Sequence, residues 1–170
     1  MSSSLIAAAF AHHAWATLRL VDACESLSAE QLAVTVPGTF GSAIETLRHV
    51  VESDADYLNI LRDMPEPWFD LREAPLPELR SVAERVAEGW TAFLASKPDS
   101  ERLVREIDPD DGYTRDAPVG VRLAEALHHG NEHRTQLLAI FGALGVPAPR
   151  ISVWDYGLAE GRIVEVYPER

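Results

Sequence analysis

Four stretches of the chain carry apolar residues at the three- and four-residue spacing of an amphipathic helix. This spacing predicts long helices over residues 4–27, 42–62, 77–96 and 119–144, and a single turn of helix over residues 29–32. The first stretch is rich in alanine and leucine, which indicates burial on more than one side. Helices of this number and length predict an all-α protein.

Capping residues mark several helix ends in the sequence. Ser42 and Glu45 fit a capping box, in which the Ser hydroxyl and the Glu carboxylate satisfy free amide groups of the first turn. Ser28 is placed to cap the single turn of helix. Gly145 stands where the last helix should end, and Pro147 prevents its continuation. These residues therefore predict helix boundaries as well as helices.

Two long connections separate the predicted helices. Residues 64–77 contain four prolines and are predicted to form an irregular crossing. Residues 97–118 are predicted to be irregular too, with a turn over 110–112 and a short extended piece over 103–107. Because a long connection permits two consecutive helices to run parallel, four long helices joined in this way predict a four-helix bundle.

The C-terminal residues 151–170 show some alternation of Ile, Val and Tyr, but they are too few to form a sheet of their own. No internal repeat or low-complexity segment is present. A chain of 170 residues buries enough surface with one hydrophobic core. We therefore predict a single domain over residues 1–170.

Composition then excludes several classes of function. The net charge of -12 opposes nucleic acid binding, which requires clustered Lys and Arg. No apolar run approaches the roughly 20 residues that span a bilayer. The start of the chain also lacks the basic region of a secretory signal, so we predict a cytoplasmic protein without membrane or nucleic acid partners.

Cys24 is the only cysteine, which excludes a Cys-rich zinc site, and it is expected to be a buried apolar residue.

Two histidines on the last helix are placed to act together. His129 and His133 are four residues apart, so their imidazoles lie one turn apart on or beside the apolar face, whereas His128 points to nearly the opposite side. Such a pair either binds a metal ion or is buried and hydrogen-bonded to backbone or carboxylate partners. The spacing leaves both interpretations open. Because Glu132 directly precedes His133, the helix lacks the His-Glu-x-x-His motif of zinc proteases.

The remaining histidines of interest lie on other helices. His49 shares a stripe of the second long helix with acidic residues, namely Glu45, Glu52 and Asp56. That stripe is either a solvated face or a set of carboxylates that orients a metal-binding imidazole. His12 and His13 are either ordinary helix residues or, for one of them, part of the wall of an interior pocket.

Four blocks of the sequence resemble, in order, the DinB-like family of small metalloenzymes. These blocks are WATLRLVDA, GSAIETLRHVVE, HHGNEHRTQLLAIFGALG and VWDYG. The resemblance covers nearly the whole chain and is most specific around His49 and around His129 and His133. It implies a four-helix bundle with an up-down-down-up course, often a homodimer. It also implies that His49, His129 and His133 hold one divalent metal ion, with zinc or nickel as the expected metals.

The resemblance also implies a class of chemistry. Similar members look like transferases or isomerases that use bacillithiol, mycothiol or glutathione, and the family name does not imply DNA binding. Three imidazole ligands leave a coordination position open for water or a substrate thiol. We therefore expect a metal-dependent S-transferase that activates a small thiol for attack on an electrophile, or a hydrolase. A metal-binding stress-response protein without catalysis is the alternative. Arg122 and Gln136 either orient an anionic substrate or are polar residues of the helix margin.

Overall fold

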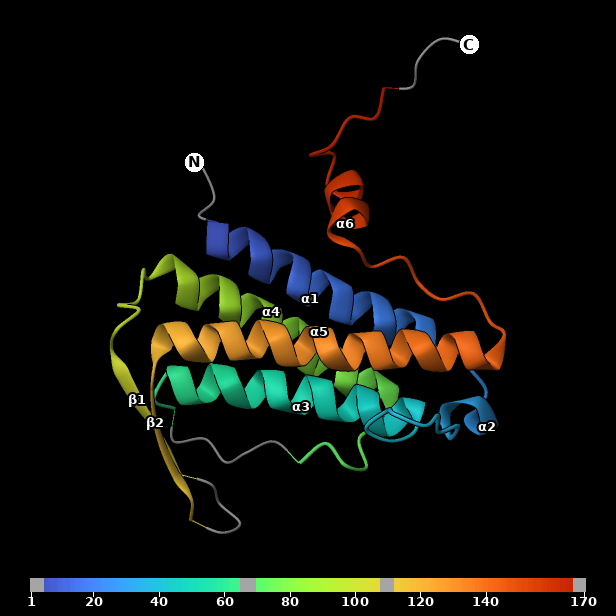
Figure 1. Cartoon of the computed structure of the whole chain (residues 1–170), viewed down its shortest axis with the longest axis horizontal. Coiled ribbons are helices and arrows are strands. Elements are labelled where there is room, and N and C mark those ends of the chain that lie inside the picture. The colour runs from blue at the N-terminus through green and yellow to red at the C-terminus, as the bar shows by residue number, and fades with distance from the viewer. Residues whose placement is uncertain (1–4, 65–69, 108–111, 167–170) are drawn as a thin grey trace.

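The computed structural model describes residues 5–64, 70–107 and 112–166 of the 170-residue chain. The fold is mostly helical, as the apolar spacing predicts. Four long helices lie side by side (Figure 1): α1 (Leu5–Cys24), α3 (Ala43–Leu61), α4 (Leu76–Ala95) and α5 (Val119–Leu144). Helices α1 and α5 run in one direction, and α3 and α4 run in the other (Figure 1).

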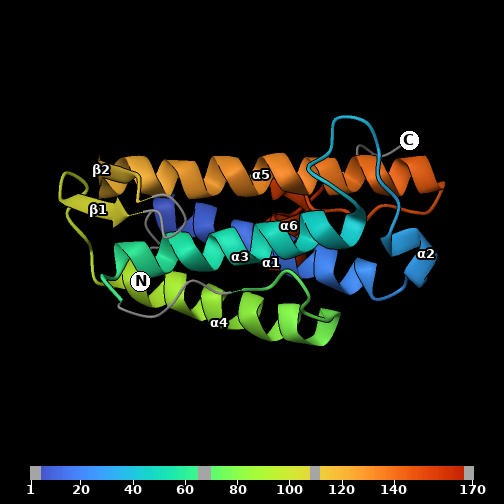
Figure 2. The same cartoon turned by 90° about the horizontal axis from the view of Figure 1, so that it is seen from below.

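The shorter elements lie at the ends and the side of these helices. Helix α2 (Ala29–Leu32) follows α1, and strands β1 (Leu103–Ile107) and β2 (Thr114–Pro118) form an antiparallel pair. This pair lies at the end of the helices where α3 finishes and α5 begins (Figure 2). Helix α6 (Val153–Ala159) lies beside α1, and the chain after it projects away from the long helices (Figure 1).

The capping residues act as their positions predict. The Ser42 hydroxyl accepts from the amide of Glu45, and the Glu45 carboxylate accepts from the amide of Ser42. Ser28 makes the same arrangement at α2. Gly145 ends α5 with φ of 66°, a left-handed conformation that favours glycine.

One hydrophobic core lies between the four long helices. Its largest fully buried apolar side chains come from all four of them: Phe10, Leu20, Leu47, Leu61, Leu79, Trp90, Leu137, Ile140 and Phe141. Cys24 is completely buried in the same cluster and is a free thiol, as predicted for a small apolar residue. Burial raises the pKa of the Cys24 thiol to about 12, so it is protonated at neutral pH.

Two elements differ from the sequence predictions. The extended piece over 103–107 is strand β1, but the irregular stretch after it also contains β2, whose backbone pairs with β1 from Thr114 to Pro118. The C-terminal segment forms helix α6, which Ser152 and Asp155 begin with a capping box. The predicted crossing over 64–77 and the predicted turn over 110–112 fall partly outside the described residues. Among the described helices, none combines the length and the apolar character needed to cross a bilayer.

Candidate metal centre

Three histidines from two helices converge at the contact between α3 and α5. His49 lies on α3, and His129 and His133 lie one turn apart on α5. One ligand atom from each imidazole lies within 4.8 Å of the other two, and these three residues form the one such group of His, Cys, Asp or Glu among the residues that the structure describes. The structure therefore brings together the histidines that the sequence singles out.

The spacing of the imidazoles fits a bound ion. The Nε2 atoms of His49 and His129 lie 3.1 Å apart. Two nitrogen ligands of one tetrahedral zinc ion lie about 3.3 Å apart, given metal–nitrogen bonds of about 2.0–2.1 Å. All three donors are imidazole nitrogens, which suit zinc, nickel, copper and iron alike. These residues could therefore hold one divalent ion without a protein carboxylate or thiolate.

A side-chain amide determines which nitrogen of His133 faces the other histidines. The Gln136 Oε1 lies 3.0 Å from His133 Nδ1 and accepts a hydrogen bond from the Phe40 amide at 2.8 Å. The Phe40 donor identifies this atom as the amide oxygen, so His133 Nδ1 must carry the proton that it donates to Gln136. The Nε2 of His133 keeps its lone pair for a metal ion. Hydrogen bonds of this kind orient metal-binding histidines and raise their basicity.

The loop before α3 covers the imidazoles on one side. The Phe40 ring stacks on the His49 ring with centroids 4.0 Å apart and an interplanar angle of 6°. The same ring meets His133 edge to face at 5.5 Å. The Phe40 ring thus limits rotation of the His49 and His133 imidazoles. The Phe40 amide also holds Gln136, which contacts His133.

Burial keeps two of these histidines neutral. It lowers the pKa of His49 to about 4, and the neighbouring His133 acts in the same direction. Burial likewise lowers the pKa of His129 to about 4, with smaller contributions from His133 and His49. Both imidazoles therefore carry free lone pairs at neutral pH, which metal binding requires.

The model of the DinB family matches residues 1–163 of the chain. This chain belongs to the DinB family. The match spans all described helices and all three histidines, in agreement with the resemblance seen in the sequence blocks. No curated protein matches the chain. Membership of the DinB family does not select a substrate, since related folds carry different chemistry in their sites.

Other residues considered for the DinB-family site have different roles. His128 is exposed, as predicted from its position on the helix. The Glu45 carboxylate caps α3, and Glu52 accepts from the amide of Leu71 at 2.9 Å, so these two acids of the stripe are engaged by groups other than His49. The orienting group is Gln136, which the sequence presented only as a substrate contact or a polar margin residue.

Arg122 does not orient a substrate in this structure. Its guanidinium is buried, donates to Glu106 at 2.8 Å and donates to the carbonyl oxygens of Val104 and Arg115. These contacts fasten the β1–β2 pair to the start of α5. Arg122 is therefore a structural residue of the hairpin.

A cavity opens beside His49. It has a volume of about 540 Å³ and is lined by residues of both charges together with Phe40: Gly41, Glu45, Arg48, His49, Glu52, Arg72 and Glu73. Tyr57 lies on the other side of the cluster, with its ring 5.6 Å from that of His129. Burial raises the pKa of the Tyr57 hydroxyl to about 12, so it is a proton donor at neutral pH. The cluster thus has a polar cavity at one histidine and a phenol at another.

His13 belongs to a separate buried network. Its Nε2 lies 3.0 Å from Asp54 Oδ1, in a direction unfavourable for a hydrogen bond, and the Trp90 indole donates to the same oxygen at 3.0 Å. Arg134 donates from Nη1 to His13 Nδ1 at 3.2 Å and to Thr17 Oγ1 at 3.2 Å. Since Arg only donates, His13 Nδ1 is the acceptor and the imidazole proton is on Nε2, facing Asp54. His12 is half-buried, and both histidines line one cavity, which is the second of the two interpretations that the sequence left open.

Proposed function

We propose that this DinB-family protein is a metal-dependent thiol S-transferase, with zinc or nickel held by His49, His129 and His133. The observation that carries the proposal is the convergence of three imidazoles, with two Nε2 atoms 3.1 Å apart and no acidic or thiol ligand in the described group. A set of three protein ligands is typical of catalytic zinc sites, which keep a position open, whereas structural sites are closed by four.

The protein's own residues prepare this site in three ways. Burial of His49 and His129 keeps their lone pairs free of protons, as their lowered pKa values indicate. Gln136 holds His133 with Nε2 free. Phe40 restricts the His49 ring by stacking on it. When bound, the ion would supply Lewis acidity that lowers the pKa of a coordinated thiol for attack on an electrophile.

The cavity beside His49 supports a small polar thiol as the substrate. Its wall carries Arg48 and Arg72 as well as three glutamates. A low-molecular-weight thiol with ammonium and carboxylate groups matches walls of mixed charge. In the transfer, the thiol sulfur bonds to the electrophile, and the thiol proton leaves with the displaced group. A hydrolase would use water in place of the thiol.

Metal content and thiol conjugation together test this proposal. Protein purified without a polyhistidine tag should contain about one equivalent of zinc or nickel by elemental mass spectrometry. It should also conjugate a thiol such as glutathione to 1-chloro-2,4-dinitrobenzene, and a chelator should abolish this activity. His129→Ala should lose both metal and activity, whereas His128→Ala, its exposed neighbour, should keep both. Activity that persists in metal-free His129→Ala would contradict the proposal.

A metal-binding protein without catalysis is the alternative, because an ion held by these histidines would tie α3 to α5. This alternative predicts a large fall in the melting temperature when the metal is removed, with no turnover for any thiol. Turnover that depends on the metal would exclude it.

We also propose a four-helix bundle with an up-down-down-up course, on the basis of the helix directions in Figure 1. A homodimer and a cytoplasmic location are parts of the same proposal, and they rest on the family resemblance and on the composition. Sedimentation of the purified protein measures the oligomeric state directly.

A further inference from the structure

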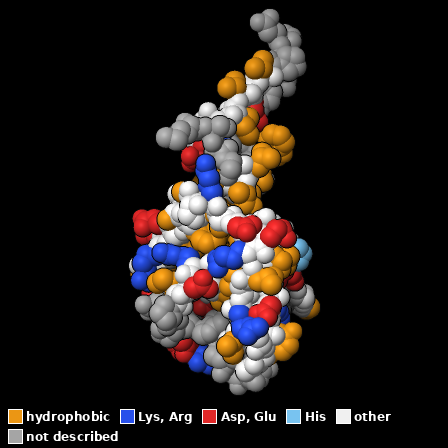
Figure 3. Space-filling view, turned by 90° about the vertical axis from the view of Figure 1, so that its left-hand side faces the viewer, with side chains coloured by type: hydrophobic (Ala, Val, Ile, Leu, Met, Phe, Trp, Pro, Cys, Tyr) orange, Lys and Arg blue, Asp and Glu red, His pale blue; other side chains and the backbone are white. Residues whose placement is uncertain are grey.

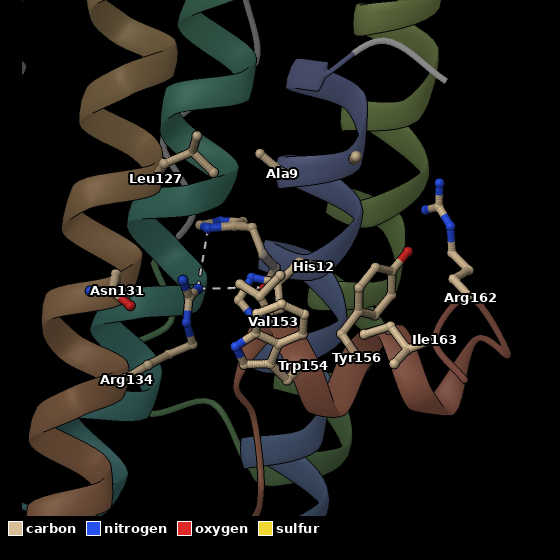
Figure 4. A pocket seen from close by; sticks show the side chains of 13 residues that line it. Ala9, His12, Leu127, Asn131, Arg134, Val153, Trp154, Tyr156, Arg162 and Ile163 are labelled. Atoms are coloured by element: carbon tan, nitrogen blue, oxygen red, sulfur yellow. Dashed lines mark hydrogen bonds between the residues drawn. The ribbon is translucent and has the colours of Figure 1, made fainter. Parts of the chain in front are cut away.

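A second cavity lies on a different side of α5 from the three histidines. It is lined by α1, α5, α6 and the residues just after α6 (Figure 4), and it has a volume of about 670 Å³. Helix α5 contributes Leu127, Asn131 and Arg134 to its wall. At about 100° per residue, Asn131 lies about 160° around the helix from both His129 and His133. The cavity is therefore separate from the candidate metal centre, and its size is within the range of about 300–1,000 Å³ for small-molecule sites.

Most of this cavity wall is apolar. Helix α6 and the residues after it supply Val153, Trp154, Tyr156 and Ile163, and α1 supplies Ala9 (Figure 4). A wall of this kind favours a ligand with an apolar body, because its binding removes apolar surface from water.

One buried cation, Arg134, also lines the cavity. The side chain is only 4% exposed and reaches from α5 toward α1 (Figure 4). Its Nη1 is engaged by His13 and Thr17. Its Nε and Nη2 make no hydrogen bond to any residue that the structure describes. A guanidinium keeps donors in a planar fork, so these two N–H groups present a bidentate site.

No carboxylate pairs directly with Arg134 among the described residues. Asp54 is the acid whose charge acts on it, but His13 lies between them, and Trp90 also donates to the Asp54 oxygen. Burial lowers the pKa of Arg134 to about 10, and the charge of Asp54 acts in the opposite direction. A buried charge without a direct partner is costly, and an anion in the cavity would relieve that cost.

We propose that this cavity binds a small molecule with an apolar body and one carboxylate, with the carboxylate on Arg134 and the body along Trp154 and Tyr156. A carboxylate matches the planar donor fork of arginine, and hydrogen bonds between ionised groups are about twice as strong as neutral ones. One carboxylate matches Arg134, the buried cation; Arg162, the other cation in the lining, is exposed and lies on the segment after α6. This site is independent of the proposed transferase activity.

Contacts with α1 hold α6 in place as the outer wall. His12 Nε2 lies 2.9 Å from the carbonyl oxygen of Ile151 and donates to it. The Tyr156 ring packs on His12 and Trp15, with centroids 5.9 and 5.5 Å away. On α6, Val153 and Trp154 are 62% and 73% exposed. Apolar side chains continue along the segment that projects beyond α6 (Figure 3). Contacts with α1 thus fix the position of α6, while part of the apolar surface of α6 is exposed to solvent.

Calorimetry with a matched pair of probes tests the proposal. We expect 4-phenylbutyrate to bind the full-length protein at one site, and the neutral 4-phenylbutan-1-ol to bind at least about tenfold more weakly, because it lacks the charge-assisted pairing. Ala9→Phe, which fills the cavity from α1, should abolish binding. Trp154→Ala should weaken it, whereas Val166→Ala, an exposed apolar change outside the cavity, should leave it unchanged. Both cavity variants should retain the metal content of the parent, which separates this result from any failure of the metal centre.

Three results would overturn the proposal. One is equal affinity for the acid and the alcohol, which would mean that Arg134 does not select the ligand. Another is unchanged binding of the acid in both Ala9→Phe and Trp154→Ala. The third is absence of probe binding together with a dimer that Trp154→Ala converts to a monomer in sedimentation, because a second copy of the chain would then be the occupant of this face. Arg134→Met tests the guanidinium in the same calorimetry, on condition that the circular dichroism of the variant matches that of the parent.

Discussion

His13 on α1 and His133 on α5 lie in two different polar surroundings, which differ in how the charges and polar atoms are balanced. His13 is 1% exposed and lies between a carboxylate, Asp54, and a guanidinium, Arg134. His133 meets two other imidazoles, with ring centroids 4.6 Å away for His49 and 4.4 Å for His129. The first histidine joins opposite charges, whereas the second belongs to a group of like acceptors.

This difference separates a structural network from a candidate site. Around His13 a carboxylate and a guanidinium of opposite charge lie on either side of the ring, so the arrangement is balanced within the folded protein in the absence of any ligand. Around His49, His129 and His133 three ring nitrogens converge without a cation among the described residues. Convergent acceptors favour the binding of a cation from outside the chain. Substitutions around His13 should therefore affect mainly the stability of the fold. Substitutions around His49, His129 and His133 should affect mainly the affinity for a metal ion.

The largest expected effect is on stability, from Asp54→Ala. The change removes the carboxylate beside His13 Nε2, the acceptor of Trp90 Nε1 and the acid whose charge acts on the buried Arg134. Removal of one partner of a buried pair costs about 3–5 kcal/mol. Urea unfolding should show this loss, while Glu132→Ala, an exposed acid on α5, should change stability by less than about 0.5 kcal/mol. A small effect of Asp54→Ala would remove the distinction between the two regions.

The next effect is on metal affinity, from Gln136→Ala. Loss of the acceptor for His133 Nδ1 and the Phe40 amide frees the imidazole to rotate. Loss of such an orienting group weakens metal binding by about 10- to 100-fold. Competition with a chromogenic chelator measures this affinity. Gln136→Glu retains an acceptor and should stay within a few-fold of the parent; equal losses in both variants would argue against the orienting role.

Gly130→Ala tests the packing of the His13 network at the contact between α1 and α5. A Cβ at this position would lie 2.5 Å from His13 Cε1 and 2.9 Å from Arg134 Nη1. We expect a net loss of about 1–2 kcal/mol, because the strain exceeds the gain in helix propensity. Gly142→Ala, on the same helix with nothing within 4 Å, should instead stabilise the protein. Thermal unfolding of both variants measures the contrast, and equal shifts would contradict it.

A last expected effect, which needs no substitution, is the pH dependence of the metal-free protein. The pKa values of His49 and His129 are lowered to about 4, whereas histidines in the unfolded chain titrate near pH 6.5. Between these values the unfolded state binds more protons, so the free energy of unfolding should decrease as the pH falls from 7 toward 4. Urea titrations at pH 7.5 and 5.0 in the presence of a chelator measure this change. The double variant His49→Gln, His129→Gln should show a weaker dependence on pH.

Local signals predicted most of the fold. The helix α5 boundaries, the Ser42 capping box and the extended piece at 103–107 depend on residues close in sequence. Strand β2 was missed because its sequence, TRDAP, is polar and ends in proline, so only pairing with β1 makes it a strand. Helix α6 was missed because alternating apolar residues suggested extended chain, although Ser152 and Asp155 carried a short capping signal.

The candidate site was only partly accessible from the sequence. The four-residue spacing identified His129 and His133 and rejected His128, whereas His49 was joined to them by family resemblance. The role of Gln136 could not be predicted, since it depends on the Phe40 amide from a loop 96 positions away. The network around His13 was also hidden, because Asp54 and Arg134 come from two other helices.

The neighbouring residues His133 and Arg134 serve two different sites from a single turn of α5, the first the three-histidine cluster and the second the cavity beside α6. An insertion or deletion of one residue rotates all later side chains by about 100°. One such event between Gly130 and His133 would turn both side chains away from their partners at the same time. A length change after Gly142, where α5 is exposed and close to its end, would leave both in place. Scanning single-residue insertions along α5 should therefore divide the helix into an intolerant middle and a tolerant end.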